Sequence, residues 1–425
     1  MAKVYKQRIV DDLLKRKLEG KGAVLVEGAK WCGKTTTSEQ VAKSVKYMTE
    51  IGKTDENLQI AALNPQLILK GDKPRLIDEW QVAPRLWDSI RYEADHSDEL
   101  GLFILTGSSV PADMSDVLHS GTGRFGWLKM RTMTLWESGD SSGEVSLEDL
   151  FNQVKFAGGE NKLDLERVAY LCCRGGWPKA LSMREDIALD QAFDYIDAVE
   201  KRDVSNADGV SRDSARVHRL LRSYARNIGT QANYSTFCED LKANEGESFD
   251  EDTIASYIKA LKDIFVIEDS SAWNPNLRSK TAIRTSDTRY FTDPSIATAA
   301  LGIGPKDLMN DLKTFGFVFE CLCVRDLRVF AESLFGSVHH YRDKNGLECD
   351  AVVHLRDGRY GLVEVKLGGD KLIAEGVDSL LSLAKKIDTD KMKKPSFLMV
   401  LTAAGSYAYQ REDGIFVVPI GCLKH

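Results

Sequence analysis

The sequence lacks any apolar run near the ~18 residues that a membrane-spanning helix needs, so no membrane segment is expected. Its eight cysteines are scattered without the paired C-x₂-C spacing of zinc sites, which favours reduced thiols in the cytoplasm. Residues 1–12 are rich in charge and carry no apolar signal-peptide core. The net charge of -7 argues against wholesale coating of nucleic acid but leaves local basic surfaces possible. At 425 residues, the chain is too long for one typical domain.

The strongest functional signal is the phosphate-loop pattern G-x-x-x-x-G-K-[ST]. With one further threonine, it comprises Gly28, Ala29, Lys30, Trp31, Cys32, Gly33, Lys34, Thr35 and Thr36. The two glycines permit a backbone that turns successive N–H groups toward phosphates. In such loops the lysine reaches the β- and γ-phosphates, and the hydroxyl after it holds Mg²⁺. A buried strand predicted over 23–26 precedes the loop and a helix predicted over 36–45 follows it. The pattern therefore predicts binding of ATP or GTP, and we expect ATP.

An acidic pair, Asp78 and Glu79, ends the next apolar run. Asp78 is expected to support Mg²⁺, usually through water, and Glu79 to orient and polarise the attacking water. The alternative is a solvated acidic turn after a strand. A further predicted strand over 102–105 leads to Thr106 and Ser108, either of which could sense the γ-phosphate or place the water. A plain Thr-Gly turn is the alternative there.

Arg124 lies in the glycine-flanked segment 121–125. An arginine at this place can stabilise charge on the transferring phosphoryl group, in its own subunit or across a subunit boundary. The second case requires a homo-oligomer. A surface or structural role is the alternative, and the sequence leaves both open.

The order of these segments resembles a family of bacterial and archaeal AAA+ ATP-binding proteins that carry a DUF4143 C-terminal region. The matching segments are 28–36, 77–81, 105–109, 121–125, 174–178 and 201–204. The resemblance covers essentially the whole chain. It implies a multidomain α/β fold: a P-loop AAA+ core with a parallel sheet over 1–140, a helical lid over 145–210, a winged-helix module over 211–305, and a domain similar to PD-(D/E)xK nucleases over 306–425. It implies no settled biological role.

Residues 212–300 also show the element order of a winged helix. Helices are predicted over 216–228, 235–244 and 252–265, and strands over 265–268 and 288–292. The third helix, which would enter a DNA groove, begins with three acids and carries only Lys259 and Lys262. The segment after it is more basic, with Arg278, Lys280, Arg284 and Arg289. Contact with DNA phosphates and packing between ATPase subunits therefore both stay open.

The C-terminal region carries a second chemical pattern. Asp350 precedes a predicted strand over 351–355, and a turn joins it to a strand over 360–366 that holds Glu364 and Lys366. Residues two apart in a strand share a face, so Glu364 and Lys366 point to the same side. Together with Asp350, and with Glu320 on a helix beginning near Leu312, they are candidates for binding Mg²⁺ or Mn²⁺ and cleaving phosphodiesters. The alternative is an ion-paired hairpin.

A run of lysines follows this pattern and comprises Lys385, Lys386, Lys391, Lys393 and Lys394. These side chains could contact a phosphate backbone, although such a run is also typical of a solvated face.

The sequence as a whole predicts a cytoplasmic, Mg²⁺-dependent ATPase whose C-terminal module binds nucleic acid and is a candidate nuclease. One rival is an ATP-dependent switch or scaffold whose nuclease-like domain binds a partner without cutting. The other is a P-loop kinase, which Asp78 and Glu79 disfavour because a carboxylate dedicated to water suits hydrolysis. The expected ligands are ATP, Mg²⁺, a second divalent ion at the C-terminal pattern, DNA and further copies of the chain.

Overall fold

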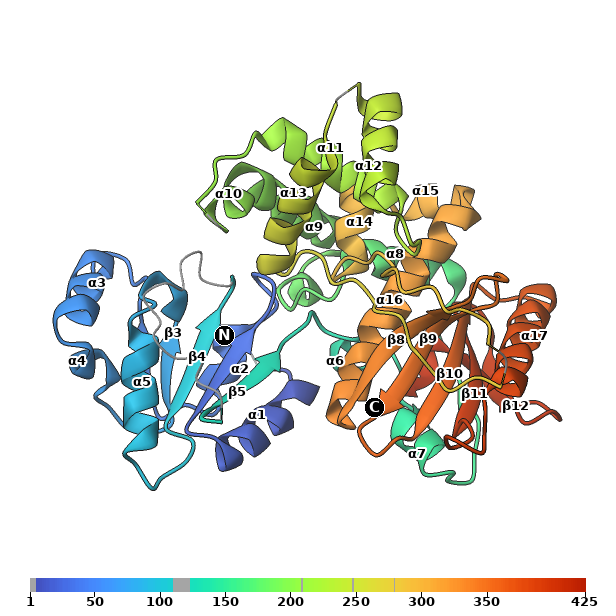
Figure 1. The fold of residues 1–425 in the computed structure, drawn as a ribbon, viewed down its shortest axis with the longest axis horizontal. Helices are drawn as coiled ribbons and strands as arrows, with labels where there is room; N and C mark the ends of the chain where they lie inside the picture. Colours follow the sequence, from blue (N-terminus) through green and yellow to red (C-terminus); the bar gives the residue numbers. More distant parts are fainter. Residues whose placement is uncertain (1–4, 110–122, 208, 247, 279) are drawn as a thin grey trace. The chain divides into compact units, whose positions relative to one another are not determined.

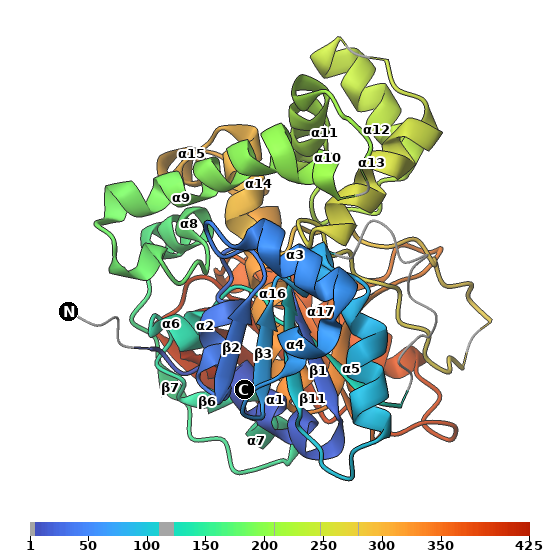
Figure 2. The same cartoon turned by 90° about the vertical axis from the view of Figure 1, so that its left-hand side faces the viewer.

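The computed structural model describes residues 5–109, 123–207, 209–246, 248–278 and 280–425. The chain forms two compact units (Figures 1 and 2). The first comprises Met1–Thr132, Ala198–Ser214 and Ser256–Val266, and the second Met133–Asp197, Ala215–Ala255 and Ile267–His425. Both units are of the α/β class, as predicted. No helix in these described ranges has the length and apolar character needed to cross a membrane.

A five-stranded parallel sheet forms the centre of the first unit, in the order β2-β3-β4-β1-β5. Its strands are β1 (Ala23–Glu27), β2 (Ser44–Tyr47), β3 (Arg75–Asp78), β4 (Phe103–Gly107) and β5 (Phe125–Lys129). Parallel strands covered on both faces are expected to be continuously apolar, which fits the complete burial of β3 and β4. The strands predicted before the phosphate loop and before Asp78 and Thr106 are confirmed.

Helices cover both faces of this sheet. One face packs against α3 (Thr54–Leu63), α4 (Pro65–Leu69) and α5 (Leu86–Asp95) through one apolar cluster. The other face packs against α1 (Ile9–Gly20) and the phosphate loop through a second cluster. Figure 2 shows this unit with α3, α4 and α5 in front. The phosphate loop is therefore packed in one apolar cluster with the buried strand β1 and the helix α1.

The helix predicted over 36–45 is shorter than expected. It is α2 (Lys34–Glu39), and Ser44 already begins the edge strand β2. Val45 packs against the core, and the backbone of β2 pairs in register with that of β3. Strand pairing and burial of a β-branched side chain outweigh the local absence of helix-breaking residues.

A seven-stranded mixed sheet forms the centre of the second unit, in the order β7-β12-β13-β11-β10-β9-β8 (Figure 1). Its strands are β7 (Gly159–Glu160), β8 (Gly336–Arg342), β9 (Glu348–Leu355), β10 (Tyr360–Lys366), β11 (Phe397–Thr402), β12 (Tyr407–Gln410) and β13 (Phe416–Pro419). The long helix α16 (Leu312–Ser333) contacts β8, β9 and β10. The helix α17 (Asp370–Lys386) contacts β9, β10 and β11. The predicted hairpin and the helix beginning at Leu312 are confirmed.

The remaining elements are mostly helical. They are α6 (Leu135–Ser138), β6 (Val145–Ser146), α7 (Leu147–Phe151), α8 (Leu165–Arg174), α9 (Glu185–Ala198), the π-helical η3 (Val199–Asp203), α10 (Val204–Asn206), α11 (Ser214–Arg226), α12 (Tyr234–Asp240), the π-helical η4 (Leu241–Glu245), α13 (Glu251–Asp263), α14 (Pro294–Leu301), α15 (Pro305–Asn310) and β14 (Leu423–Lys424). Short 3₁₀ turns are η1 (Trp80–Val82), η2 (Ala180–Ser182) and η5 (Ile420–Cys422). The three helices predicted for the winged-helix module are present as α11, α12 and α13.

The segment expected as a helical lid over 145–210 is divided between the two units. Its first strands join the C-terminal region, because β6 pairs with β14 and β7 pairs with β12. Residues 198–210 belong to the first unit. The backbone partners of the short strands, not the helical pattern, decide where the segment packs. The four-part division of the chain stays a prediction.

The strands expected over 265–268 and 288–292 are not continuous. Among the described residues, this part of the chain shows two isolated antiparallel bridges, Ile267 to Phe291 and Ser270 to Thr288. The segment between them pairs with the C-terminal region instead. The N–H of Arg278 donates to Lys386 O at 2.8 Å, and the N–H of Arg284 donates to Arg342 O at 2.9 Å. Backbone groups of the expected wing are thus satisfied by the neighbouring sheet and helix.

Arg289, one of the basic residues of the expected wing, is buried. Its guanidinium pairs with Asp269 at 2.6 Å and donates to the carbonyl of Ala232 at 2.9 Å. Contact with DNA phosphates would require breaking this pair, so Arg289 is withdrawn from the basic surface that the sequence predicts.

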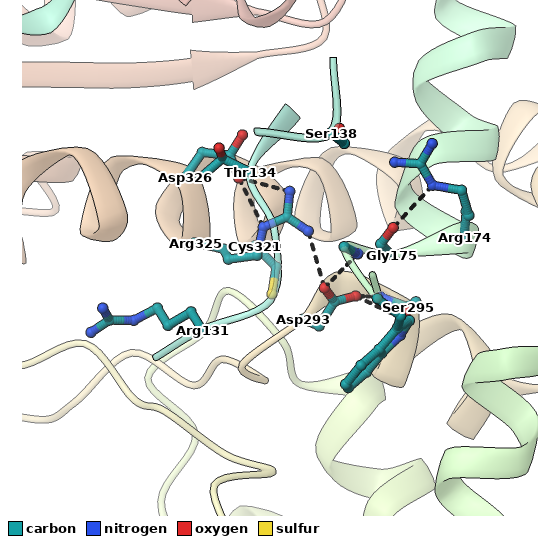
Figure 3. A network of polar contacts seen from close by, with 12 residues as sticks. Arg131, Thr134, Ser138, Arg174, Gly175, Asp293, Ser295, Cys321, Arg325 and Asp326 are labelled. Atoms are coloured by element: carbon teal, nitrogen blue, oxygen red, sulfur yellow. Dashed lines mark hydrogen bonds and ion pairs between the residues drawn. The ribbon is translucent and has the colours of Figure 1, made fainter. Parts of the chain in front are cut away.

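A buried charge network fixes the second unit internally (Figure 3). Arg325 on α16 donates to Asp293 at 3.0 Å and to Asp326 at 2.8 Å. Asp293 also accepts the N–H of Gly176 at 2.9 Å, and Asp326 accepts the N–H of Leu135 at 2.9 Å. These bonds tie the chain near 135 and the turn at 175–178 to α16. Removing one partner would leave buried charge uncompensated, which is strongly destabilising.

Candidate functional site

The phosphate loop and both acidic residues meet at one edge of the parallel sheet. Val26 pairs with Thr106, and Asp78 pairs with Thr106 from the other side, so the carboxyl ends of β1, β3 and β4 are level. Ligands of open α/β sheets bind at this edge. Residues from three separate parts of the sequence therefore form one site.

The two glycines of the loop adopt backbone conformations that other residues rarely take. Gly28 has a φ of 157°, and a Cβ there would lie 2.0 Å from the carbonyl oxygen of Met130. Gly33 has a φ of 106° and directly precedes α2. Arg8 also holds the loop, because its guanidinium donates a hydrogen bond to the carbonyl of Cys32 at 3.0 Å. Both glycines of the motif are thus required by the conformation of the loop.

Lys34 is buried at the centre of the loop. Its ammonium donates to the carbonyl oxygens of Gly28 at 2.8 Å and Ala29 at 2.9 Å. Within the described residues, no carboxylate forms an ion pair with it. A buried ammonium held only by neutral carbonyls is suited to an anionic ligand, because such a ligand would supply the missing charge.

Asp78 accepts two hydrogen bonds at the same carboxylate oxygen. The hydroxyl of Thr35 donates at 2.7 Å, and the hydroxyl of Thr106 donates at 2.6 Å. The carboxylate therefore links the loop, β3 and β4. A hydroxyl beside a carboxylate is also a suitable pair of oxygen ligands for Mg²⁺. Thr36 is exposed on the first turn of α2.

Glu79 follows in a left-handed conformation, with a φ of 57°. Its carboxylate accepts hydrogen bonds from the side-chain amide of Gln81 and from the hydroxyl of Ser108, the latter at 3.3 Å. Strained residues of this kind cluster at functional sites. Ser108 thus orients Glu79, whereas Thr106 orients Asp78. The role of Gln81 was missed from the sequence, although it stands two residues after Glu79.

A further residue at the loop was also missed. The ammonium of Lys30, inside the phosphate loop, lies 2.5 Å from the carboxylate of Asp203. Asp203 is the last residue of the π-helical η3, and π-helical turns are frequent at functional sites. The only signal in the sequence was the match of segment 201–204 to the family pattern. Trp31, beside Lys30, has a φ of 66° and a half-exposed ring.

Arg124 lies at the opposite edge of the sheet. It directly precedes β5, whose first residue pairs with the first residue of β1, whereas the phosphate loop follows the last residue of β1. Its guanidinium pairs with Asp95 at the end of α5. The strand register therefore excludes Arg124 from the phosphate site of its own subunit. Gly121 and Thr122 lie outside the described residues.

The four residues predicted in the C-terminal region also come together. Val363 pairs with Ala351, so Asp350 and Glu364 follow on adjacent strands, and the N–H of Val365 donates to Asp350 at 2.8 Å. The ammonium of Lys366 lies 2.6 Å from Glu364 and 3.6 Å from Asp350. The prediction of a shared face is confirmed.

Glu320 joins this cluster from α16. Burial raises its pKa well above the usual range, and the nearby charge of Asp350 raises it further. The hydroxyl of Tyr290 donates to its carboxylate. Burial and Asp350 raise the pKa of Glu364 to about 8, against the opposing effect of Lys366. Burial alone would lower the pKa of Lys366, but the attraction of Asp350 and Glu364 raises it.

A metal centre in this cluster is not supported by the arrangement. Among residues with described positions, no group of three or more His, Cys, Asp or Glu side chains is placed to hold a metal ion. The ammonium of Lys366 supplies the positive charge between Asp350 and Glu364 instead. The ion-paired hairpin, the alternative from the sequence, matches the observed contacts.

Comparison with known proteins identifies three regions. Residues 20–138 match the family model described as AAA domain, and residues 315–423 match that described as Domain of unknown function (DUF4143). Residues 165–307 match another domain of unknown function, DUF8612. The match over 165–307 spans parts of the expected lid and winged-helix segments.

Two curated relatives align over nearly the whole chain. They are the uncharacterized proteins Rv2008c of Mycobacterium tuberculosis and Mb2031c of Mycobacterium bovis, each 24% identical over 96% of this chain and 82% of the relative. Among solved structures, the Walker-type ATPase of Pyrococcus abyssi is 16% identical, with a TM-score of 0.42 over 70% of this chain and 96% of that one. The ORC2 protein of Aeropyrum pernix is 13% identical, with a TM-score of 0.29 over 62% of this chain and 85% of that one.

The domain matches agree with the site geometry. The AAA match contains the loop, Asp78, Glu79 and Thr106, and the DUF4143 match contains the cluster around Lys366. The first region is an AAA-type nucleotide-binding domain. The chain therefore combines a region similar to AAA domains with a C-terminal region similar to DUF4143 domains.

Proposed function

We propose that the protein binds ATP with Mg²⁺ at the phosphate loop and hydrolyses it with Glu79. The observation that carries this proposal is the convergence of Lys34, Thr35, Asp78 and Glu79 at one sheet edge. The four come from two separate segments, Lys34 with Thr35 and Asp78 with Glu79, and their side chains are held by the bonds described above. An arrangement so specific for phosphate and water is expected of a hydrolase.

The proposed roles follow from the position of each group. Lys34 contacts the β- and γ-phosphates, because it is the buried cation of the loop. Thr35 and Asp78 would hold Mg²⁺, which neutralises phosphate charge when it is bound. Glu79 accepts a hydrogen bond from the attacking water and orients it. Ser108 and Gln81 fix the carboxylate of Glu79.

The ion pair between Lys30 and Asp203 supports a link between the loop and η3. If the side chain of Lys30 moves when phosphates bind, its ion pair with Asp203 changes, since the two side chains are in direct contact. This contact favours a nucleotide-dependent switch as part of the function.

The eight cysteines are free, which supports a cytoplasmic location.

Lys34→Ala and Glu79→Gln separate binding from turnover. Lys34→Ala should weaken ATP binding, because it removes the charge on the phosphates. Glu79→Gln should keep ATP binding and lower kcat by roughly 10²–10⁴-fold, because an amide accepts no proton from water. Calorimetry and phosphate release measure the two effects. Glu56→Gln, on the exposed side of α3, is the matched control and should change neither; full-rate hydrolysis by Glu79→Gln would remove that residue from catalysis.

Arg124 is proposed to act on the nucleotide of a neighbouring copy in a homo-oligomer. This proposal is motivated by its exclusion from its own site and by its exposed side chain. Arg124→Ala and Glu79→Gln proteins, each inactive alone, should regain part of the turnover when they are mixed. The regained activity would come from interfaces that join an intact Arg124 to an intact Glu79. Absence of rescue in mixtures that demonstrably co-assemble would assign Arg124 to its pair with Asp95.

A second candidate function is phosphodiester cleavage by the C-terminal cluster. The observation in its favour is that Glu320, Asp350, Glu364 and Lys366 converge from α16, β9 and β10. A divalent ion would have to bind beside the ammonium of Lys366, so the site is proposed to depend on nucleic acid or assembly to open. In the rival function, the cluster is structural and the domain binds a partner without cutting.

Asp350→Ala should abolish any Mn²⁺-dependent cleavage of DNA by the full chain while ATP turnover continues. The reason is that the cluster and the phosphate loop lie in different units. Cleavage of single-stranded, duplex and branched DNA and the release of phosphate from ATP are measured on the same protein preparations. Asp357→Ala, in the turn between β9 and β10, is the control and should cleave as the parent does. If the parent cuts none of these DNAs in Mg²⁺ or Mn²⁺, the scaffold function replaces the nuclease.

A further inference from the structure

A groove in the second unit lies away from both sites described above. It has a volume of about 900 Å³ and is formed by residues 150–156, the end of α17 with the loop after it, and residues 410–416. This volume is within the range of small-molecule binding sites, which is about 300–1,000 Å³. The loop after α17 contains the lysine run seen in the sequence.

The walls of the groove are strongly basic. Lys155, Arg278, Lys385 and Lys394 line it, and Asp413 is the one carboxylate among the described residues that line it. Asp413 is already paired with Arg411 at 3.0 Å. The three lysines are exposed, and none of their ammonium groups forms an ion pair or a hydrogen bond with a described residue. This concentration of positive charge stands in a chain with a net charge of -7, so the groove is complementary to an anion.

Aromatic rings form part of the same groove. Phe156 and Phe416 meet edge to face with their ring centres 5.0 Å apart, and both are only partly buried. Phe397, at the start of β11, also lines the groove. Partly exposed aromatic rings beside lysines are the combination on which proteins stack nucleobases and hold the attached phosphates.

The basic wall is held in place by hydrogen bonds to its backbone groups, which leave the lysine side chains of the groove free of that role. The carbonyl of Lys393 accepts the hydroxyl of Tyr360 at 2.8 Å, and the N–H of Ser396 donates to the carbonyl of Tyr360 at 2.8 Å. At the other side, the N–H of Arg278 donates to the carbonyl of Lys386 at 2.8 Å. The groove is therefore formed before any ligand arrives.

The groove is separate from the cluster around Lys366. β10 and β11 run parallel, with Gly361 beside Phe397 and Lys366 beside Thr402. Phe397 thus marks one end of these strands, and Lys366 marks the other. A ligand in the groove would not contact Asp350 or Glu364, and its binding does not depend on nuclease or ATPase activity.

We propose that this groove binds the nucleotide unit, a phosphate group joined to a base. Lys155, Lys385 and Lys394 contact the phosphates, and Phe156 stacks against the base. The same chemistry is offered by a free nucleotide and by a single-stranded nucleic acid.

The test uses the full chain with Lys34→Ala, which weakens nucleotide binding at the phosphate loop and so reduces its contribution to the measurement. The probes are a fluorescein-labelled single strand of twelve thymidines and ADP. Replacement of Lys155, Lys385 and Lys394 by alanine should weaken binding of the responding probe at least tenfold. For the single strand, it should also lower the slope of log affinity against log salt by about 2. The matched control replaces Lys179, Lys306 and Lys313, exposed lysines of the same unit, and should bind as the parent.

Phe156→Leu tests the base contact. It should weaken binding roughly tenfold, the size of one lost stacking contact, whereas Phe156→Trp should bind as the parent. A response to the single strand alone identifies nucleic acid as the ligand, and a response to ADP alone identifies a free nucleotide. Binding of neither probe, or equal binding by the triple lysine variant and the parent, would overturn the proposal. Equal binding by folded Phe156→Leu would overturn the base contact.

Discussion

The carboxylate of Asp78 is the interaction on which the nucleotide site depends. Its one oxygen accepts the hydroxyls of Thr35 and Thr106, so the phosphate loop, β3 and β4 are joined at a single atom. The parallel register makes this possible, because it brings the ends of the strands to the same level. Glu79 directly follows Asp78, and its left-handed backbone conformation directs its own carboxylate toward Ser108 and Gln81. Without Asp78, the loop and the strand that supplies Glu79 would lose their common support.

In the second unit, charged side chains pair with one another in two clusters. Arg325 is enclosed by Asp293 and Asp326, and Lys366 lies between Asp350 and Glu364. In both clusters the positive side chain pairs with carboxylates that are buried or, for Asp350, partly buried, and it supplies the positive charge there. The basic groove is the opposite case, since its lysines face solvent without acidic partners among the described residues. The second unit thus contains two clusters of paired charges and one groove whose lysines have no acidic partner among the described residues.

The sequence predicts the phosphate loop because the residues of the loop lie close together in the chain. Gly28, Lys34 and Thr35 follow one another in a loop whose geometry dictates the residue types, and Asp78 follows a recognisable apolar strand. The boundary errors have non-local causes. Val45 becomes part of a strand because β3 lies beside it, and Arg289 leaves the basic surface because Asp269 is near in space only. Asp203, distant in sequence from Lys30, could be placed only by the fold, and the roles of Arg124 and of the Lys366 cluster stay predictions.

The dependence of ATP turnover on Mg²⁺, compared between the parent chain and Asp78→Asn, tests the central claim most directly. The account predicts that the parent releases phosphate only with Mg²⁺ and stops when the ion is chelated. Asp78→Asn should retain the hydrogen-bonded shape of the site but require far more Mg²⁺, because an amide is a weaker ligand than a carboxylate. Identical Mg²⁺ dependence of the two proteins, or turnover that persists in chelator, would contradict the account.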